Sequence, residues 1–388
     1  MQLRNFIRRQ KWRLRPLKGV VLPWRNVKRL LVARWRRVPA ISGARNYRGD
    51  SFCEAVEIYP ATVVGSLPVP FHSDEAAVDF QSEPAFIFHL KNIEFWALYG
   101  GAVLTSDNQL LADLSPEVWG VEHHPIFSRF RLPTARKLAG RTAIAVTPEA
   151  PGNYYHWLID LLPRVGLLGL TKGGFESFER LLINGRRTPY ELESLAAAGT
   201  PLEKIWYVDA RDRFQLEEAI ISSMDQFSRT VGPWKIEMLR ALGNSLPNAH
   251  SVTGRVYVSR RGAAVRRVVN EGELEKLLRV ANFTLVELET KSWKEQVGAF
   301  ANAEVILAPH GAALANIAFC KPGTLVAEIS TRAGYKDFYL QLAAAARLRY
   351  QFIEAQPRTP SSDSPLRPLE NEDLIVDLPA IEEFLATL

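Results

Sequence analysis

The chain has 388 residues, of which 47% are hydrophobic and 23% charged, a globular composition long enough for two domains. Its two cysteines, Cys53 and Cys320, lie far apart and in no CxxC or Cys/His spacing. This excludes a disulfide scaffold and a cysteine-built zinc site, and it fits a reducing compartment. No apolar run reaches the roughly 18 residues that a membrane-spanning helix requires.

The net charge of +6 is unevenly distributed along the chain. Residues 1–48 contain twelve Arg and three Lys and no acid, so the rest has 33 basic against 42 acidic residues, about −9. Basic residues interleaved with tryptophans suit an anionic membrane surface, where each positive charge contributes roughly 1 kcal/mol. A solvated arm and a nucleic-acid patch are the alternatives. Because no secretory signal is evident, we expect a cytoplasmic protein, with this basic tail as a candidate contact to the inner membrane face.

After the tail, the sequence predicts a β-rich region and then an alternating region. Short strands are expected at 85–90, 95–98 and 103–105, with turns at Gly100-Gly101 and Ser106-Asp107-Asn108 between them. From about residue 140, strands alternate with helices; the strands are expected at 142–146, 181–183 and 205–208, and the first helix near Asn153. The alternation indicates a parallel sheet with crossover helices.

A boundary is predicted around 228–234, where Thr230-Val231-Gly232-Pro233 interrupts the pattern. A second alternating set follows, with strands expected at 255–259, 284–288, 304–308, 325–329 and 350–353, and helices at 271–280, 293–301, 314–319, 335–347 and near 379–385. The sequence therefore predicts two α/β lobes, residues 49–230 and 231–388, with a ligand in the cleft between them at the carboxyl ends of strands.

The sharpest candidate site is the turn Ala308-Pro309-His310-Gly311-Ala312, in which an apolar strand enters a small-residue helix start. Gly311 permits close backbone approach, and the free N–H groups of the helix start form an anion site. His310 is positioned to donate to a phosphate oxygen. The competing interpretation is an ordinary strand-to-helix turn in which His310 caps or packs.

A second candidate lies at the end of the predicted strand 255–259. Ser259 and Arg260 stand where a side chain can reach a diphosphate. The guanidinium of an arginine can donate two parallel hydrogen bonds to the phosphate oxygens. For Arg261 and Arg266, which come later in the loop, a solvated basic loop is the favoured interpretation.

The third candidate is the segment Asn153-Tyr154-Tyr155-His156-Trp157, continuing through Asp160 to Arg164. Asn153 is a good helix N-cap, and the spacing i, i+4, i+8 places His156, Asp160 and Arg164 on one helical face. Ionisable groups on a helix that is otherwise apolar must pair or face a cleft. Either His156 or Asp160 is a candidate base for an acceptor hydroxyl. The alternative is a structural network of the three side chains that holds the helix to its sheet, and for Arg164 this structural role is the favoured interpretation.

Two further observations concern carboxylates. Glu328 ends the predicted strand 325–329, where a carboxylate often binds ribose hydroxyls. No Asp-x-Asp follows a strand, so we expect no bound metal; arginines and a helix dipole would neutralise a diphosphate instead. The sequence also lacks a GxGxxG after an early strand, a P-loop and a GxSxG elbow.

Taken in order, these segments resemble glycosyltransferase family 61. The resemblance covers roughly residues 85 to 355 and rests on Asn153-Tyr154-Tyr155-His156-Trp157 with Asp160, Val258-Ser259-Arg260, Gln296 ahead of Ala303, Pro309-His310-Gly311-Ala312 with Asn316, and Glu328. It does not include the basic tail, and secretory-pathway members of the family begin with a membrane span instead.

The resemblance implies a GT-B architecture, in which two Rossmann-like lobes with parallel sheets face each other across a cleft, here with a β-rich N-terminal addition. It implies inverting, metal-independent transfer from a nucleotide sugar, which is a substrate, so no cofactor is expected. Ser259, Arg260, His310, Gly311, Ala312, Asn316 and Glu328 match donor-side positions, and His156 or Asp160 is the implied base. We expect a bacterial enzyme of capsule, exopolysaccharide or other cell-surface polysaccharide synthesis, with a glycan or lipid-linked acceptor and no nucleic-acid partner.

Two other functions compete with this hypothesis. A nucleotide- or sugar-binding protein could keep the same fold and cleft without turnover. A Rossmann oxidoreductase is the third hypothesis, and the missing dinucleotide fingerprint argues against it.

Overall fold

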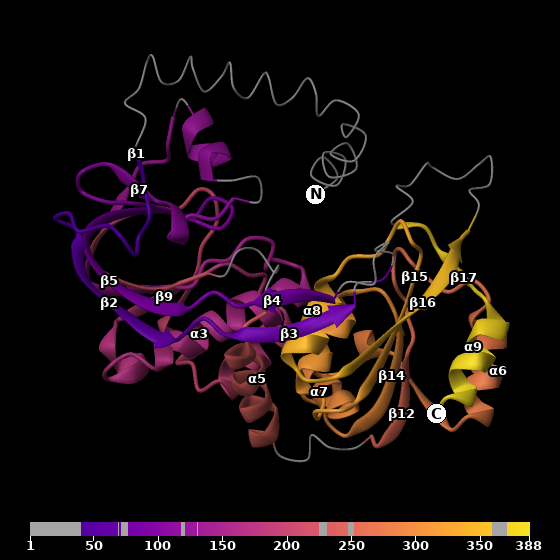
Figure 1. Cartoon of the computed structure of the whole chain (residues 1–388). Coiled ribbons are helices and arrows are strands. Elements are labelled where there is room, and N and C mark those ends of the chain that lie inside the picture. Colours follow the sequence, from indigo (N-terminus) through magenta and orange to yellow (C-terminus); the bar gives the residue numbers. More distant parts are fainter. Residues whose placement is uncertain are drawn as a thin grey trace.

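The computed structural model of the chain describes residues 40–68, 70, 77–117, 121–129, 131–224, 231–246, 252–358 and 371–388 (Figure 1). They form a mixed α/β structure with two large sheets, which confirms the predicted fold class at this level. Residues 1–39, and with them most of the predicted tail and its membrane contact, lie outside the described residues. None of the helices in the described ranges is long and apolar enough to cross a membrane.

The first sheet has nine strands in the order β1-β7-β6-β5-β11-β8-β9-β10, with β2 also paired to β5. Its strands are β1 (Ala40–Ser42), β2 (Phe52–Tyr59), β5 (Ala85–Trp96), β6 (Ala102–Leu104), β7 (Gln109–Leu111), β8 (Arg136–Ile144), β9 (Arg180–Ile183), β10 (Ile205–Tyr207) and β11 (Arg213–Ser222). Strands β8, β9 and β10 are parallel, as predicted, and β11 also pairs in parallel with β8, whereas β5 is antiparallel to both β2 and β11. A separate hairpin pairs β3 (Val63–Pro68) with β4 (Ala77–Gln81).

Three features of this sheet differ from the prediction. Strand β5 is continuous over the two strands expected at 85–90 and 95–98. Strand β11 was not predicted, although it lies in the middle of the sheet, because the glutamates at 217 and 218 interrupt its apolar pattern. Residues 40–48, assigned to the tail from their charge, belong to the folded part: β1 pairs with β7, and Ala44 and Tyr47 are buried.

The second sheet has six strands in the order β13-β12-β14-β15-β16-β17, all parallel except for the pair β16–β17. The strands are β12 (Gly254–Val258), β13 (Phe283–Val286), β14 (Ala303–Pro309), β15 (Leu325–Ser330), β16 (Arg349–Pro357) and β17 (Leu374–Val376). The helices predicted here are found as α6 (Glu271–Val280), α7 (Trp293–Ala301), α8 (Phe338–Ala345) and α9 (Leu378–Ala386). The remaining one, Ala312–Phe319, is a 3₁₀-helix.

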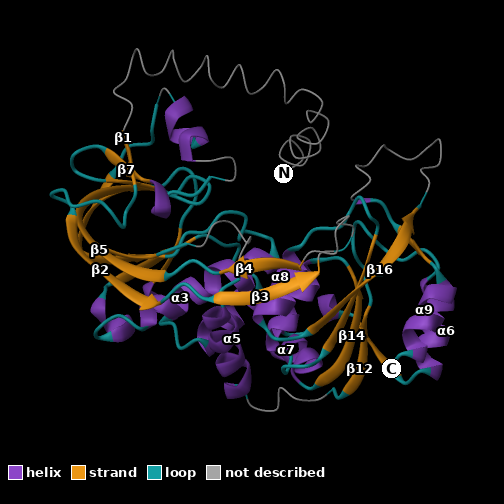
Figure 2. Cartoon of the chain, viewed as in Figure 1, coloured by secondary structure: helices purple, strands orange, loops and turns teal. Residues whose placement is uncertain are grey.

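The central strands β14 and β15, and the end of β12, are buried on both faces, which explains their continuous apolar sequences. Tyr257 and Leu307 pack under α6 and α9, whereas their neighbours Val256 and Ile306 face the opposite side with α7 and α8. That opposite side shares one hydrophobic cluster with the first sheet, which contributes Ala143 and other residues to it. Helices α3 (Leu162–Gly169) and α5 (Pro233–Ser245), both labelled in Figure 2, also contribute to this cluster, as does α4 (Pro189–Ala197). The two sheets are therefore joined by a common core.

A buried histidine makes the stability of the first sheet region depend on pH. His124 is 1% exposed, and its Nδ1 accepts a hydrogen bond from the Ile126 backbone N–H, 3.1 Å away, so Nε2 carries the proton toward the Gly101 carbonyl. Burial lowers the pKa of His124 from 6.5 to about 4. Below pH 6.5 the unfolded chain therefore binds a proton that the native state does not bind until about pH 4.

We expect this histidine to remove about 3 kcal/mol from the free energy of unfolding as the pH falls from 6.5 to 4. His124→Asn, which keeps a donor and an acceptor but does not titrate, should lose that part of the slope in urea unfolding measured at several pH values. His123→Asn, at the partly exposed neighbouring position, is the control. Equal slopes for the wild type and His124→Asn would contradict the expectation.

Candidate active site

Four of the predicted donor-side residues lie at one edge of the second sheet. Strands β12, β14 and β15 are neighbours and parallel, so their carboxyl ends meet. Ser259 and Arg260 directly follow β12, His310 directly follows β14, and Glu328 lies within β15, two residues before its end. The structure thus brings these residues to the edge where open α/β sheets bind ligands.

His310 and Glu328 form a buried pair. The Nδ1 of His310 is hydrogen-bonded to the Oε1 of Glu328, and the phenol of Tyr350 donates to Oε2 at 2.6 Å. The His310 side chain is 8% exposed and that of Glu328 is fully buried. Both carboxylate oxygens are therefore occupied within the protein. The predicted ribose contact of Glu328 stays a prediction, and the contact seen in the structure is one that orients His310.

Arg260 occupies the space beside Gly311. A Cβ atom added to Gly311 would lie 1.8 Å from Nη1 of Arg260, so only glycine leaves room for the guanidinium there. The backbone of Gly311 is extended, which means that space and not conformation requires the glycine. Arg260 donates from Nη2 to the Val265 carbonyl at 3.1 Å, while its Nε is buried with no hydrogen-bond partner among the described residues.

A second arginine lies close to Arg260. Burial, and then the positive charge of Arg266, lower the pKa of Arg260. The Glu289 carboxylate acts on the pKa of Arg260 in the opposite direction. Arg266, for which a solvated loop was the favoured interpretation, is partly buried, and its charge acts on Arg260.

The turn after His310 continues into the 3₁₀-helix Ala312–Phe319, whose first residues, Ala312 and Ala313, are small and partly exposed. Tyr339 of α8 donates from its phenol to the Gly311 carbonyl at 2.6 Å, which fixes the turn. Asn316 is fully buried, and its Oδ1 accepts a hydrogen bond of 2.6 Å from Tyr154. Asn316 thus joins the two halves of the chain, and its predicted donor contact stays a prediction.

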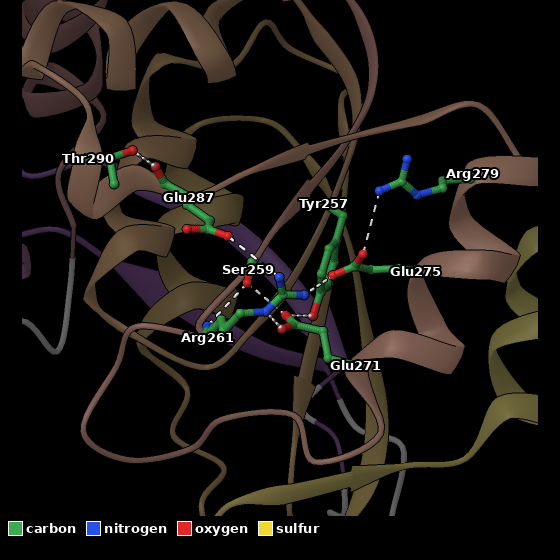
Figure 3. Close-up of polar contacts among 8 residues, drawn as sticks. All are labelled: Tyr257, Ser259, Arg261, Glu271, Glu275, Arg279, Glu287 and Thr290. Atoms are coloured by element: carbon green, nitrogen blue, oxygen red, sulfur yellow. Dashed lines mark hydrogen bonds and ion pairs between the residues drawn. The ribbon is translucent and has the colours of Figure 1, made fainter.

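Ser259 belongs to a polar network that supports the Arg260 loop (Figure 3). Its hydroxyl donates to Oε1 of Glu271 at 2.8 Å and accepts a hydrogen bond from the Arg261 backbone N–H at 3.1 Å. The side chain of Arg261 bonds Glu271 at 3.1 Å and also contacts Glu275. Arg261, for which a solvated basic loop was predicted, is instead paired with two glutamates, although its side chain is 55% exposed. The donor contact predicted for Ser259 stays a prediction, and its hydroxyl anchors the loop.

His156 and Asp160 form a second histidine–carboxylate pair. They lie on a π-helix, His156–Leu161, which runs directly into α3. The Nδ1 of His156 is 2.6 Å from Oδ2 of Asp160, and the two side chains are 16% and 13% exposed. With an ionised Asp160, Nδ1 is the donor and Nε2 is left as the acceptor atom of the ring. Single π-helical turns inside α-helices are frequent at functional sites.

Arg164, the third ionisable residue of that predicted face, ties the helix to the first sheet. Its guanidinium donates to the carbonyl oxygens of Val146 at 2.6 Å and Ser222 at 2.9 Å, and to the Thr147 hydroxyl. Both carbonyls lie at the carboxyl ends of strands, just after β8 and at the end of β11. The structural role favoured for Arg164 is confirmed by these contacts.

A run of four aromatic rings connects the two histidine pairs. The ring of His156 is 5.5 Å from that of Tyr155, Tyr155 is 5.7 Å from Tyr339, and Tyr339 is 5.2 Å from His310. Burial, and then the Asp160 carboxylate, raise the pKa of Tyr155 well above 10, so its phenol stays protonated. The two pairs, which are far apart in the sequence, therefore lie on either side of one tyrosine contact.

Sequence reasoning missed three residues of this arrangement. Tyr339 lies in an Ala/Leu-rich stretch whose pattern predicts core, and Tyr155 has no signal of its own beyond its place in the segment from Asn153 to Trp157. Lys235, on the first turn of α5, is 3.9 Å from Asp160 and carried no signal beyond being a lysine beside a tryptophan. No local pattern marks such residues, because their partners belong to other elements.

The described ranges contain no group of three or more His, Cys, Asp or Glu side chains that could hold a metal ion. Residues 154–327 match the model of a protein family described as Glycosyltransferase 61. This segment contains His156, Asp160 and Arg260, and it includes the turn at His310, while Glu328 is the first residue beyond it. No curated protein matches the chain.

Proposed function

We propose that the chain is an inverting glycosyltransferase that uses a nucleotide-sugar donor, and the match of residues 154–327 to the Glycosyltransferase 61 family model supports this proposal. The observation that carries the proposal is the pair of histidine–carboxylate contacts on either side of Tyr155 and Tyr339. One pair stands beside two arginines, and the other contains an imidazole ring that can serve as a base. These are the two requirements of the reaction, a site for a leaving anion and a base.

The donor side of the proposed site is formed by the second sheet. Arg260 and Arg266 supply positive charge beside Gly311, and the 3₁₀-helix after it begins with Ala312 and supplies backbone N–H groups. The Glu328 carboxylate is hydrogen-bonded to Nδ1 of His310 and orients the ring, and in this proposal the Nε2 side of the ring contacts a phosphate oxygen. In this proposal Ser259 and Asn316 hold the surrounding chain in place.

The acceptor side is formed by the π-helix. His156 accepts the proton of the acceptor hydroxyl at Nε2 as the hydroxyl oxygen attacks the anomeric carbon of the donor sugar. The bond from that carbon to the diphosphate breaks, and its electron pair leaves with the nucleoside diphosphate. Asp160 orients the ring and stabilises the imidazolium that forms. Between the two candidate bases, the geometry thus favours His156, with Asp160 as its partner.

We further propose the two-lobed GT-B arrangement, with residues 49–230 on the acceptor side and 231–388 on the donor side. Strand order supports it, because each region forms its own sheet. The acceptor proposed is a glycan or a lipid-linked glycan of a bacterial cell-surface polysaccharide, such as a capsule or exopolysaccharide. The fifteen basic residues among 1–48 support contact with an anionic membrane surface.

A panel of nucleotide sugars tests the proposal. We expect one donor class, together with its nucleoside diphosphate, to raise the melting temperature by mass action on the folded state. The same donor should support transfer to an oligosaccharide or lipid-linked acceptor, with inversion at the anomeric carbon seen by NMR, and a chelator should leave the rate unchanged. Stabilisation without transfer to any acceptor would favour a binding protein, and stabilisation by NAD alone an oxidoreductase.

A further inference from the structure

Lys235 is a buried lysine next to the His156–Asp160 pair. It lies on the first turn of α5 and is 4% exposed. Its Nζ is 3.9 Å from Oδ1 of Asp160 and 5.8 Å from the centre of the Trp234 ring. Lysines are almost never buried this deeply unless they are paired, because removing the ammonium from water is costly. The burial of Lys235 must therefore be explained by the groups around it, of which Asp160 carries the opposite charge.

Asp160 stands between the lysine and the histidine. Its Oδ2 contacts His156 and its Oδ1 faces Lys235, so the three side chains form a line of alternating charge when the imidazole is protonated. Asp160 and Lys235 also line one small pocket with Arg164, Thr147 and other residues, at the carboxyl ends of β8 and β11. A separation of 3.9 Å exceeds a direct hydrogen bond, so the interaction is mainly electrostatic.

We propose that Lys235 is a positioning residue that holds Asp160 in place and offsets its charge, so that His156 remains able to accept a proton. The inference rests on the proposed role of His156. An aspartate alone beside a histidine favours the imidazolium, which cannot act as a base. A lysine on the far side of the aspartate opposes this effect. Neither the family match nor the contact between His156 and Asp160 assigns this role to Lys235 or to any other residue of α5.

Other charged and titratable groups surround the pair and are the same in every variant below. Arg164 follows on the same helical segment and shares the pocket. Tyr155 contacts the His156 ring, and from the α8 side Tyr339 and Asp337 act on Tyr155. Since none of these is changed, a difference between Lys235 variants reports the lysine charge itself.

The test follows the imidazole signals of His156 by NMR as a function of pH in the full chain, with His156→Asn for assignment. In Lys235→Met the midpoint of the His156 titration should rise by about one pH unit, because the Asp160 charge is no longer opposed. Lys235→Arg should restore the wild-type midpoint. Lys204→Met removes a lysine that is 2.8 Å from Glu176, away from this pair, and should have no effect. An unchanged midpoint in Lys235→Met, or equal behaviour of the Met and Arg variants, overturns the proposal.

Transfer kinetics provide the second measurement. The acidic limb of the kcat profile should move to higher pH in Lys235→Met by the same amount as the NMR midpoint, with the donor KM changed less than twofold. Because the NMR titration needs no turnover, it reports the Lys235–His156 coupling even if the wild type transfers no sugar, in which case the proposed function fails by itself. A shifted NMR midpoint with an unshifted rate profile would show that His156 is not the base.

Discussion

Replacing His156 by alanine is expected to lower kcat for sugar transfer by about 10²- to 10⁴-fold, the usual contribution of a general base. The donor KM and the stabilisation by the nucleoside diphosphate should stay close to wild type, since His156 lies with the acceptor-side pair and the donor-side pair is His310–Glu328. Steady-state transfer assays together with thermal shift measurements check both parts of this expectation.

The matched variant is Asp160→Asn, which keeps the shape of the partner and removes its charge. We expect a smaller loss of kcat than in His156→Ala, because the imidazole remains but its orientation and charge stabilisation are weakened. If Asp160→Asn loses activity completely while His156→Ala retains it, the two roles are reversed and Asp160 is the base. Equal activity of all three proteins would remove this pair from the reaction.

Replacing Arg260 by alanine is expected to weaken binding of the nucleoside diphosphate by about 10- to 100-fold, because a charge-assisted contact to the diphosphate is lost. Binding of the nucleoside without phosphates should change little, which separates a phosphate contact from a general loss of fold. Isothermal titration of the two ligands against wild type and variant provides the measurement. Similar losses for both ligands would contradict a diphosphate role.

Gly311→Ala provides an independent version of this experiment. The added methyl group would meet the Arg260 guanidinium, so the arginine must move, and diphosphate affinity should fall in the same direction. Gly262→Ala is the control, because it adds the same group in the same loop region with nothing within 4 Å. Loss of affinity in the Gly262 variant would show that any added methyl group in this region weakens binding. The loss in Gly311→Ala could then not be attributed to the contact between Gly311 and Arg260.

Much of the second sheet region could be predicted because its local patterns are strong. Helices α6 and α7 begin and end where their periodicity and first-turn acids predict, and α7 has the capping box Ser292–Glu295. Strands β12, β14 and β15 are short apolar runs, typical of parallel strands buried on both faces. Strand β11 escaped prediction because its solvent-facing glutamates resemble loop or helix sequence, and only its pairing with β5 and β8 makes it a strand.

The candidate site was predictable to a different extent. His156 and Asp160 could be paired from their spacing, because residues four apart on a helix face each other, although the segment is a π-helix. Arg260 and His310 were placed at the same sheet edge by the strand pattern. That Arg260 lies against Gly311 depends on how the 260–266 loop folds over the turn, and no periodicity encodes such a contact.

By itself, the sequence determined where most strands of the second sheet end and its helices begin, and therefore which polar side chains stand at the carboxyl edge of that sheet. Hydrophobic periodicity and turn residues carry that information because they act within a few residues. Only the tertiary structure decided the partners: Glu328 orients His310, Lys235 faces Asp160, and Tyr155 meets Tyr339. These contacts join residues from different elements, and their distances depend on strand order and on the packing of helices between two sheets, which a local pattern does not contain.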